Sequence, residues 1–186
     1  MHNRLIRVTS FSFPVAYAAF ALATLGATGC HVDVYHDPPH DPHSDRLQHV
    51  VGGNYEIHPL SNQGLCLDVR GDKAAANQEV WLYACHGKEN QRWAFVDKPN
   101  SSSNITGVGG LCLDVTGWQT AEGTPVNIHP CGADQANQTF RHFENGQLRE
   151  VQSGKCLGVA SVAEGQRLVI GSCVEGAAGQ VWALTQ

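Results

Sequence analysis

The chain of 186 residues has little charge and few long apolar stretches. Only 16% of its residues are charged, acidic residues outnumber basic ones, and the formal net charge is −5. A general attraction to nucleic acid phosphates is therefore not expected. Glycine is frequent, with 20 residues. Low charge, frequent glycine and short apolar runs favour an all-β protein whose short strands are joined by turns.

The sequence also lacks the patterns that carry metal or catalytic chemistry. None of its seven cysteines forms a Cys-x-x-Cys pair, so a metal site built on cysteine is not expected. No pairing of a nucleophile with a base stands out, and we expect neither enzymatic activity nor a cofactor. Six cysteines occur in pairs within repeated segments while Cys30 stands apart, so the two groups need different explanations.

The first 30 residues predict an export signal. Residues 1–7 contain two arginines and no acid, an apolar run covers 11–28, and a glycine and Cys30 follow. This order is typical of a secretory signal peptide. Residues 25–30 resemble a bacterial lipobox, which implies cleavage before Cys30 and attachment of a diacylglycerol to its sulfur. Ordinary cleavage nearby, with Cys30 left as a free thiol, is the alternative.

A lipid on Cys30 would make the membrane a partner of the protein, because several acyl chains hold a protein on a bilayer far better than one. The next residue is His31 rather than aspartate. Aspartate there resembles an inner-membrane retention signal, so its absence implies an exported protein anchored at the outer membrane or cell surface.

Residues 31–50 predict a disordered tether. They contain three prolines, four aspartates and five histidines, with little apolar surface to bury. Alternating histidine and aspartate could bind a metal weakly. No spacing among them defines a coordination geometry, however, and we interpret the segment as a solvated spacer without a metal site.

The rest of the chain repeats a single pattern three times. Cys66-Leu67-Asp68-Val69 is matched by residues 112–115 and, with glycine in place of the acid, by 156–159. A second cysteine follows each first one after 19, 19 and 17 residues, and the repeats start 46 and then 44 residues apart. Repeats of this length indicate a repeated structural unit.

Each repeat has an alternating apolar run before its second cysteine, which predicts a strand with one buried face. The residues expected to face the core are Val80, Leu82, Val126, Ile128, Leu168 and Ile170. Three units of about four strands each would make a closed body with few free strand edges.

Each repeat also ends in a related motif, Gln91-x-Trp93, Gln138-x-Phe140 or Gln180-x-Trp182. The Cys-Leu-Asp-Val start, the strand ending in cysteine and the Gln-x-Trp close resemble the ricin B-type lectin family. The resemblance implies an all-β trefoil fold with three pseudo-symmetric repeats. It covers residues 51–186, with repeats at about 51–97, 98–143 and 144–186.

The resemblance and the alignment of the repeats also suggest what holds the fold together. The closing aromatic residues Trp93, Phe140 and Trp182 would fill a shared core. The cysteines would pair within each repeat, and export makes their oxidation plausible. The expected disulfides are Cys66–Cys85, Cys112–Cys131 and Cys156–Cys173.

In this family the matching residues of repeat one bind sugar. The resemblance makes Asp68 the acceptor for two sugar hydroxyls, Tyr83 the stacking platform, Asn90 a hydroxyl-binding amide and Gln91 its support. Trp81 would lie on the same strand face as Tyr83 and widen the platform. A sugar needs this combination because one ring face is apolar and its rim carries hydroxyls.

Repeat two keeps the set and repeat three loses it. The second site would consist of Asp114, Asn127, His129, Asn137 and Gln138, with Trp118 as a possible extra stacking surface. In repeat three, glycines stand at the acid, platform and amide positions, and only Gln180 remains. Packing positions and ligand positions therefore vary separately, and we expect two sugar sites.

These observations predict a non-catalytic, carbohydrate-binding lipoprotein, with a galactose-type sugar or a polysaccharide as ligand. Two alternatives stay open: a protein-interaction trefoil without sugar affinity, and an accessory carbohydrate-binding subunit of a separate glycoside hydrolase. Each site residue also has a purely structural interpretation, since an aspartate can cap a turn and an Asn-Gln pair can brace a loop.

Overall fold

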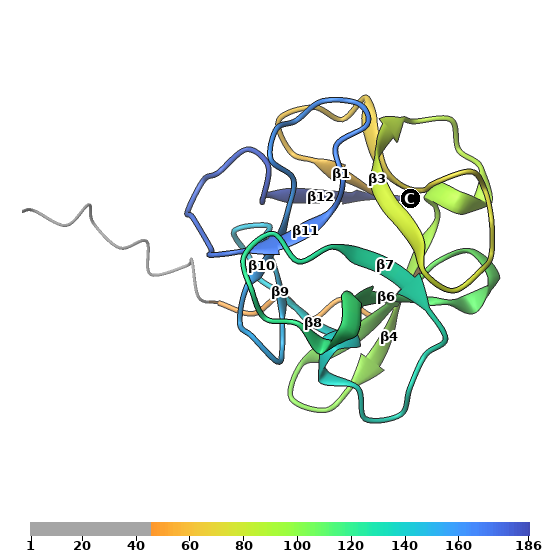
Figure 1. Ribbon diagram of the computed structural model, residues 1–186. Coiled ribbons are helices and arrows are strands. Elements are labelled where there is room, and N and C mark those ends of the chain that lie inside the picture. The colour runs from red at the N-terminus through yellow and green to blue at the C-terminus, as the bar shows by residue number, and fades with distance from the viewer. Residues whose placement is uncertain (1–45) are drawn as a thin grey trace, which may run out of the picture. The chain divides into compact units, whose positions relative to one another are not determined.

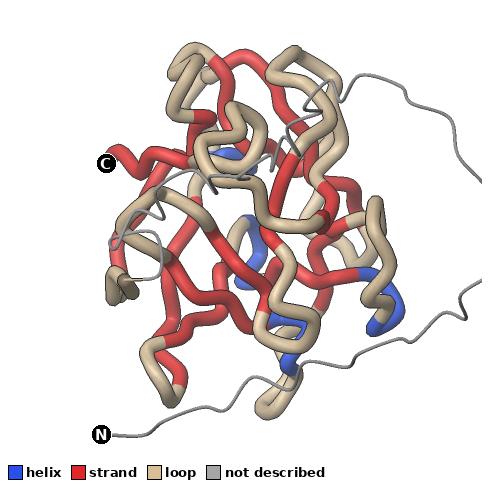
Figure 2. Tube along the Cα trace, turned by 90° about the vertical axis from the view of Figure 1, so that its left-hand side faces the viewer, coloured by secondary structure: helices blue, strands red, loops and turns tan. Residues whose placement is uncertain are grey.

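The computed structural model describes residues 46–186, which form an all-β protein with short 3₁₀ turns between the strands (Figures 1 and 2). The predicted signal peptide, the lipidation site Cys30 and tether residues 31–45 lie outside the described residues. Within residues 46–186, no helix is both long and apolar enough to span a bilayer.

Twelve strands follow one another along the described chain, four in each repeat. They are β1 (Gly52–Pro59), β2 (Leu65–Val69), β3 (Gln78–Ala84), β4 (Trp93–Lys98), β5 (Ser102–Thr106), β6 (Cys112–Val115), β7 (Val126–His129), β8 (Thr139–His142), β9 (Leu148–Glu150), β10 (Cys156–Gly158), β11 (Val169–Gly171) and β12 (Trp182–Thr185). Four 3₁₀ turns join them: η1 (Glu89–Gln91), η2 (Val108–Gly110), η3 (Thr116–Trp118) and η4 (Ala136–Gln138).

The first and last strands of each repeat form a ring of six. Antiparallel ladders join β12 to β1, β1 to β4, β4 to β5, β5 to β8, and β8 to β9. Between β9 and β12 the ring is bridged by the amide of Trp182, which donates to the carbonyl of Gly146 at 2.9 Å. Closure in this way leaves few strand edges free.

The two middle strands of each repeat form hairpins, β2–β3, β6–β7 and β10–β11. The hairpins contact one another as well: β3 pairs with β7, and isolated bridges join Trp81 to Arg167 and Pro125 to Val169. A six-stranded ring with three hairpins that meet is a β-trefoil, and the fold predicted from the repeats is confirmed.

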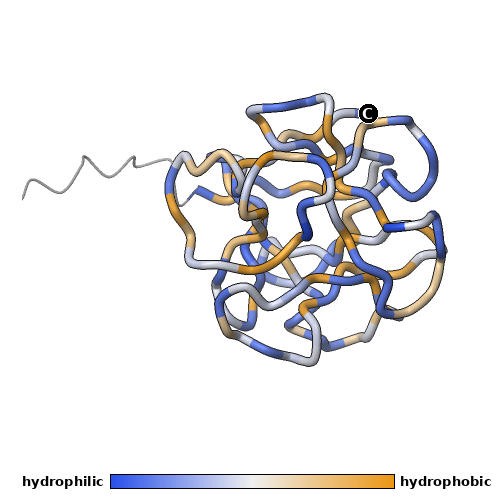
Figure 3. Tube along the Cα trace, turned by 45° about the horizontal axis from the view of Figure 1, so that its top comes forward, coloured by the Kyte–Doolittle hydropathy of each residue, from blue (hydrophilic) through white to orange (hydrophobic). Residues whose placement is uncertain are grey.

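The core lies where the predicted strand faces meet. All six residues expected to face inward, from Val80 to Ile170, are fully buried, and Trp93, Phe140 and Trp182 join them in one cluster. Figure 3 shows the corresponding alternation of apolar and polar residues along the tube. The three disulfides have the expected pairing, Cys66–Cys85, Cys112–Cys131 and Cys156–Cys173.

The segment 46–50 differs from the expectation of a disordered tether ending at residue 50. It lies against the domain, where the amide of Glu144 donates to the carbonyl of Arg46 and the amide of Gln48 donates to the carbonyl of His142, both at 2.8 Å. The end of β8 and the turn after it thus supply the backbone groups that the segment pairs with, and such partners cannot be read from composition.

The closing tryptophans also donate hydrogen bonds from the core. The indole of Trp93 donates to the carbonyl of Leu67 at 3.0 Å, and that of Trp182 to the carbonyl of Leu157 at 3.2 Å. Phe140, at the same position in repeat two, has no N–H to donate. Two repeats therefore link the end of the repeat to its Cys-Leu start by a buried hydrogen bond.

Replacing Trp93 by phenylalanine should destabilise the domain by about 2 kcal/mol, because it removes this buried hydrogen bond and leaves a small cavity. Urea unfolding of the oxidised protein would measure the change. The matched control is Trp118→Phe, at a tryptophan that is 48% exposed, which should change stability by less than about 0.5 kcal/mol. Equal effects of the two substitutions would contradict the role given to Trp93.

Candidate functional site

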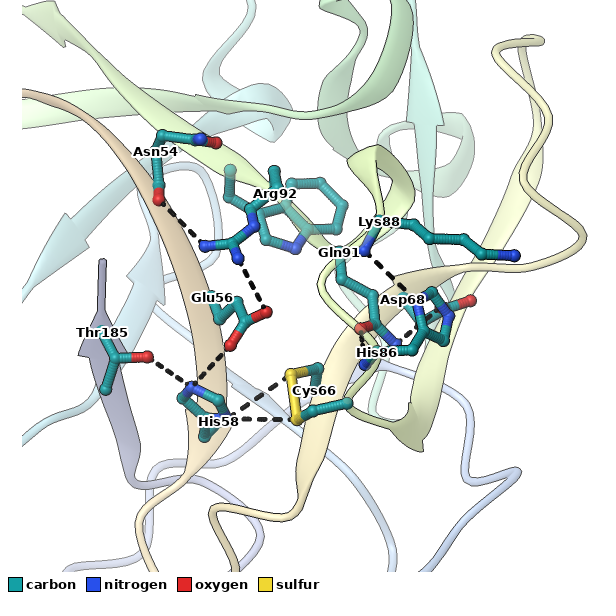
Figure 4. Close-up of polar contacts among 12 residues, drawn as sticks. Asn54, Glu56, His58, Cys66, Asp68, His86, Lys88, Gln91, Arg92 and Thr185 are labelled. Carbon is teal, nitrogen blue, oxygen red and sulfur yellow. Dashed lines mark hydrogen bonds and ion pairs between the residues drawn. A yellow bond between two sulfur atoms is a disulfide. The ribbon is translucent and has the colours of Figure 1, made fainter.

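The carboxylate of Asp68 is the centre of a hydrogen-bond network in repeat one, and Figure 4 shows it beside Gln91 and His86. Its Oδ2 accepts from Asn90 Nδ2 at 2.8 Å and from Gln91 Nε2 at 2.9 Å, and its Oδ1 accepts from Trp81 Nε1 at 2.8 Å. The side chain is buried. A buried carboxylate is tolerated only when donors surround it, and here the protein supplies three neutral ones.

Gln91 and Asn90 connect this carboxylate to the backbone on either side. Gln91 Nε2 also donates to the carbonyl of Ala84 at 3.0 Å, and its Oε1 accepts from the amide of His86 at 2.8 Å. Asn90 Nδ2 donates to the carbonyl of Val69 at 3.1 Å. The turn η1 is therefore fastened to both strands of the β2–β3 hairpin, as the supporting role of Gln91 requires.

The aromatic residues of β3 form a stack beside the carboxylate. The rings of Trp81 and Tyr83 are parallel to within 16°, with centroids 5.5 Å apart. The guanidinium carbon of Arg70 lies 4.7 Å from the centre of the Trp81 ring. A hydrogen bond from Arg70 lowers the pKa of Glu79, which accepts it at 2.8 Å. Trp81 is thus held in place by its neighbours, on the same strand face as Tyr83.

A pocket of about 350 Å³ opens in front of this network. Four residues predicted from the sequence line it, Asp68, Trp81, Tyr83 and Asn90. It is also lined by residues that the sequence pattern did not indicate: Arg70, Gly71, Asp72, His86 and Lys88. Gln91 lies behind the pocket and does not line it.

His86 is the most informative of these additional residues. Its Nε2 lies 3.3 Å from Asp68 Oδ2, and its ring meets the edge of Tyr83 with centroids 6.1 Å apart. The amide that Gln138 holds in repeat two belongs to Gly132, which takes the place of His86. Because this contact is not repeated, comparison of the repeats could not have found it.

Repeat two contains the same hydrogen-bond network around its aspartate, with different residues beside it. Asp114 Oδ2 accepts from Asn137 Nδ2 at 3.1 Å and from Gln138 Nε2 at 2.8 Å. Gln138 also holds the backbone on both sides, as Gln91 does, through the carbonyl of Pro130 and the amide of Gly132. The predicted acid, amide and supporting glutamine are therefore brought together in both repeats.

The remaining predicted residues of repeat two lie around this centre. Asn127 pairs with Asp114 across the β6–β7 ladder, and His129, half-buried, pairs with Cys112. Trp118 lies four residues after Asp114, as Asp72 does after Asp68, and both have positive φ, 59° and 55°. An exposed tryptophan thus stands at the turn position that lines the pocket in repeat one.

Three buried amide oxygens at these two centres have no hydrogen-bond donor. They are Oδ1 of Asn90, Asn127 and Asn137, and the described residues contain only two other such side-chain atoms, both ring nitrogens of His142. Burial lowers the pKa of His142 to about 4, so its ring is neutral near pH 7. Unpaired buried acceptors are uncommon in proteins, and most of those here belong to the two centres.

Repeat three has lost the space for such a centre. A side chain at Gly179, the position of Asn90, would begin 2.4 Å from the carbonyl oxygen of Val159. Glu122 reaches across from repeat two and accepts from the amide of Ser172 at 3.0 Å. This carboxylate lies 3.4 Å from where a side chain at Gly171 would start. Hydrogen bonds from Ser172 lower the pKa of Glu122, which therefore stays ionised in this position.

One further cluster of potential metal ligands lies behind the β2–β3 hairpin. Glu56, His58, Cys66 and Cys85 have ligand atoms within 4.8 Å of one another. The two sulfurs are bonded to each other, and His58 Nδ1 lies 3.5 Å from each of them (Figure 4). With its sulfurs in a disulfide, the group offers no thiolate to a metal.

Comparisons with known proteins agree with this geometry. The ricin-type beta-trefoil lectin domain matches residues 53–185. A seed lectin of Trichosanthes anguina is 29% identical over 139 residues, 74% of this chain and 26% of the lectin. The "Probable lipoprotein EnvE" of Salmonella typhimurium is 32% identical over 130 residues, 67% of this chain and 69% of that protein.

Among solved structures, the designed three-fold symmetric protein ThreeFoil aligns with a TM-score of 0.66 and 27% identity, over 71% of this chain and 97% of that one. The chain thus spans about a quarter of the seed lectin but nearly all of the designed trefoil. The match to the lectin domain covers most of the described residues, and its start and end coincide with the trefoil. This chain therefore belongs to the ricin-type β-trefoil lectin domain family.

Proposed function

We propose that the protein binds carbohydrate at two sites, site one around Asp68 and site two around Asp114, without catalysing a reaction. The observation that carries the proposal is the repetition of one network, a buried carboxylate held by an asparagine and a glutamine, in two of three repeats. Repeat three keeps the core residues but lacks the network. The packing of a repeat therefore does not depend on the network.

The ligand that suits these sites is a sugar with one apolar face and adjacent hydroxyls, such as galactose. Its axial hydroxyl leaves the C–H groups of the opposite face together, and such a face stacks on an aromatic ring. Tyr83, 37% exposed, supplies the ring in site one, and His129 with Trp118 supplies it in site two. A hydroxyl donating to a carboxylate contributes about 1.5–3 kcal/mol.

The arrangement of the acids supports binding without catalysis. Glycoside hydrolysis commonly needs two carboxyl groups about 5–9.5 Å apart across one bond. Asp68 and Asp114 lie on different hairpins, and each has an oxygen already held by an asparagine and a glutamine. Each of these two acids therefore serves its own site rather than forming such a pair with the other.

Export and anchoring through Cys30 complete the proposal. The N-terminal sequence has the order of a lipoprotein signal, and a relative that the chain matches over most of its length is named a probable lipoprotein. Three disulfides suit a protein that leaves the cytoplasm. An anchored protein of this kind would hold a glycan or polysaccharide at the bacterial surface.

Binding should depend on both carboxylates. Asp68→Ala and Asp114→Ala should each weaken one site by about tenfold or more, because a charged acceptor is lost, and the double variant should not bind galactose in calorimetry. Glu122→Ala is the matched control, since it removes the carboxylate that fills repeat three. Wild-type protein that binds no sugar in a glycan screen would favour the protein-interaction alternative.

Two sites on one rigid body should act together on a polymer. On an immobilised galactose polymer, the wild type should bind at least about tenfold more tightly than either single-site variant. For free galactose, the remaining site of each variant should keep its own dissociation constant. Surface plasmon resonance with polymer and with free sugar measures both, and equal polymer binding by all three proteins would argue for a single working site.

Anchoring depends on the sulfur of Cys30. Metabolic labelling with a fatty acid should mark the wild type and fail to mark Cys30→Ala, which should appear in the soluble fraction. Cys30→Ser is a useful companion because it keeps the size of the side chain. An unlabelled, soluble wild type would exclude lipidation.

A further inference from the structure

The disulfide that closes repeat one lies against a buried histidine. His58, 4% exposed, comes from β1, and its Nδ1 lies 3.5 Å from the sulfurs of both Cys66 and Cys85 (Figure 4). The positions eight residues before the first cysteine hold Asn104 in repeat two and Leu148 in repeat three. The contact of an imidazole with the disulfide therefore belongs to repeat one and is not a requirement of the fold.

The distances from this nitrogen to the two sulfurs suit a shared metal ion. In a tetrahedral zinc site the metal lies about 2.3 Å from sulfur and about 2.0 Å from nitrogen. A nitrogen and a sulfur at the tetrahedral angle are then about 3.5 Å apart, which is the distance found here for each sulfur. The two sulfurs are bonded to each other, so only their own separation has to increase for both to reach one ion.

The other nitrogen of the ring is held as a metal-binding histidine requires. Nε2 lies 2.7 Å from the hydroxyl of Thr185 and 3.8 Å from Glu56 Oε2, and Arg92 lies 3.2 Å from the other oxygen of Glu56. Such histidines usually donate their second N–H to a nearby oxygen. Because Nδ1 lies 3.2 Å from the carbonyl of Leu65, either ring nitrogen can carry the proton, and metal binding selects Nε2.

The second sulfur has room to move once the disulfide is open. Cys66 is fully buried in β2, whereas Cys85 is partly exposed and follows the end of β3, in a stretch without strand or helix that runs to Lys88. The Cα atoms of the two cysteines are 5.1 Å apart, so rotation of the Cys85 side chain separates the sulfurs while β2 and β3 stay paired. Solvent beside Cys85 supplies water as a fourth ligand.

We propose that Cys66, Cys85 and His58 bind a zinc ion when the first disulfide is reduced, so that metal and disulfide are alternative ways to close repeat one. A dithiol reductant supplies two electrons and two protons to the disulfide and is itself oxidised to a disulfide. Zinc then displaces both thiol protons. Two thiolates and one divalent cation sum to zero net charge, which suits a largely buried position. Thiolate and imidazole are also donors that zinc prefers.

Zinc at this position holds the same part of repeat one that the disulfide holds. The carbonyl of Ala84 and the amide of His86, on either side of Cys85, are both hydrogen-bonded to Gln91. Fixing Cys85 to Cys66 and His58 through a metal therefore keeps this loop in place while the cysteines are reduced. The zinc site does not rest on sugar binding, and sugar binding by the oxidised protein does not rest on it.

The first test uses the full chain with Cys30→Ala, reduced with tris(2-carboxyethyl)phosphine, and zinc as the probe. At one equivalent of zinc, X-ray absorption should show two sulfurs and an imidazole around the metal. His58→Gln should weaken binding by at least about 100-fold and Glu56→Gln by about tenfold, since Glu56 only orients the ligand. A metal shell without imidazole, or equal affinities of the parent protein and His58→Gln, would overturn the proposal.

A second test compares the three cysteine pairs within one molecule and needs no substitution in the site. The reduced protein is treated with oxidised glutathione, with and without one equivalent of zinc, then quenched with a chelator and an alkylating reagent for peptide mapping. Zinc should slow formation of the Cys66–Cys85 disulfide by about tenfold or more, because a thiolate bound to metal is a poorer nucleophile. The other two pairs should form at unchanged rates. Equal slowing of all three pairs would contradict the proposal.

Discussion

A carboxylate removed from water must be surrounded by donors, and this requirement organises two of the three repeats. Asp68 and Asp114 are buried, and each takes two side-chain donors from the turn that closes its repeat, η1 or η4. The glutamine of each turn also holds backbone beyond the second cysteine. The hydrogen bonds around one buried carboxylate thus link the start, the middle and the end of a repeat of about 45 residues.

The alternation of a strand separates what supports the fold from what could bind a ligand. On β3, Val80 and Leu82 point into the core, while Trp81 and Tyr83 line the pocket. Substitutions on the outer face of the strand can therefore change the binding site with little effect on the packing of the core. Repeat three is the natural example, because Leu168 and Ile170 remain buried although no carboxylate stands opposite them.

The features that could be predicted from the sequence are those that recur with the repeat: the trefoil, the inward strand faces and the cysteine pairs. The position of Trp81 was predicted, on the strand face of Tyr83, and its role as a stacking surface stays a prediction. Its hydrogen bond to Asp68 was not predicted. Contacts between repeats, such as Glu122 with Ser172, were missed because they occur once and their partners are 50 residues apart.

Repeat three also explains why a lost centre of this kind is hard to regain. Without the acid at Gly158, nothing requires an asparagine nearby, and the chain closes so that the amide of Val159 donates to the carbonyl of Gly179 at 3.0 Å. A new side chain at Gly158 would start 3.0 Å from Gln180 and 3.3 Å from that carbonyl. An aspartate there would lack its asparagine, while an asparagine at Gly179 would collide with backbone. The aspartate and the asparagine therefore form the network only when both are present. Two of the three repeats have both residues and the complete network.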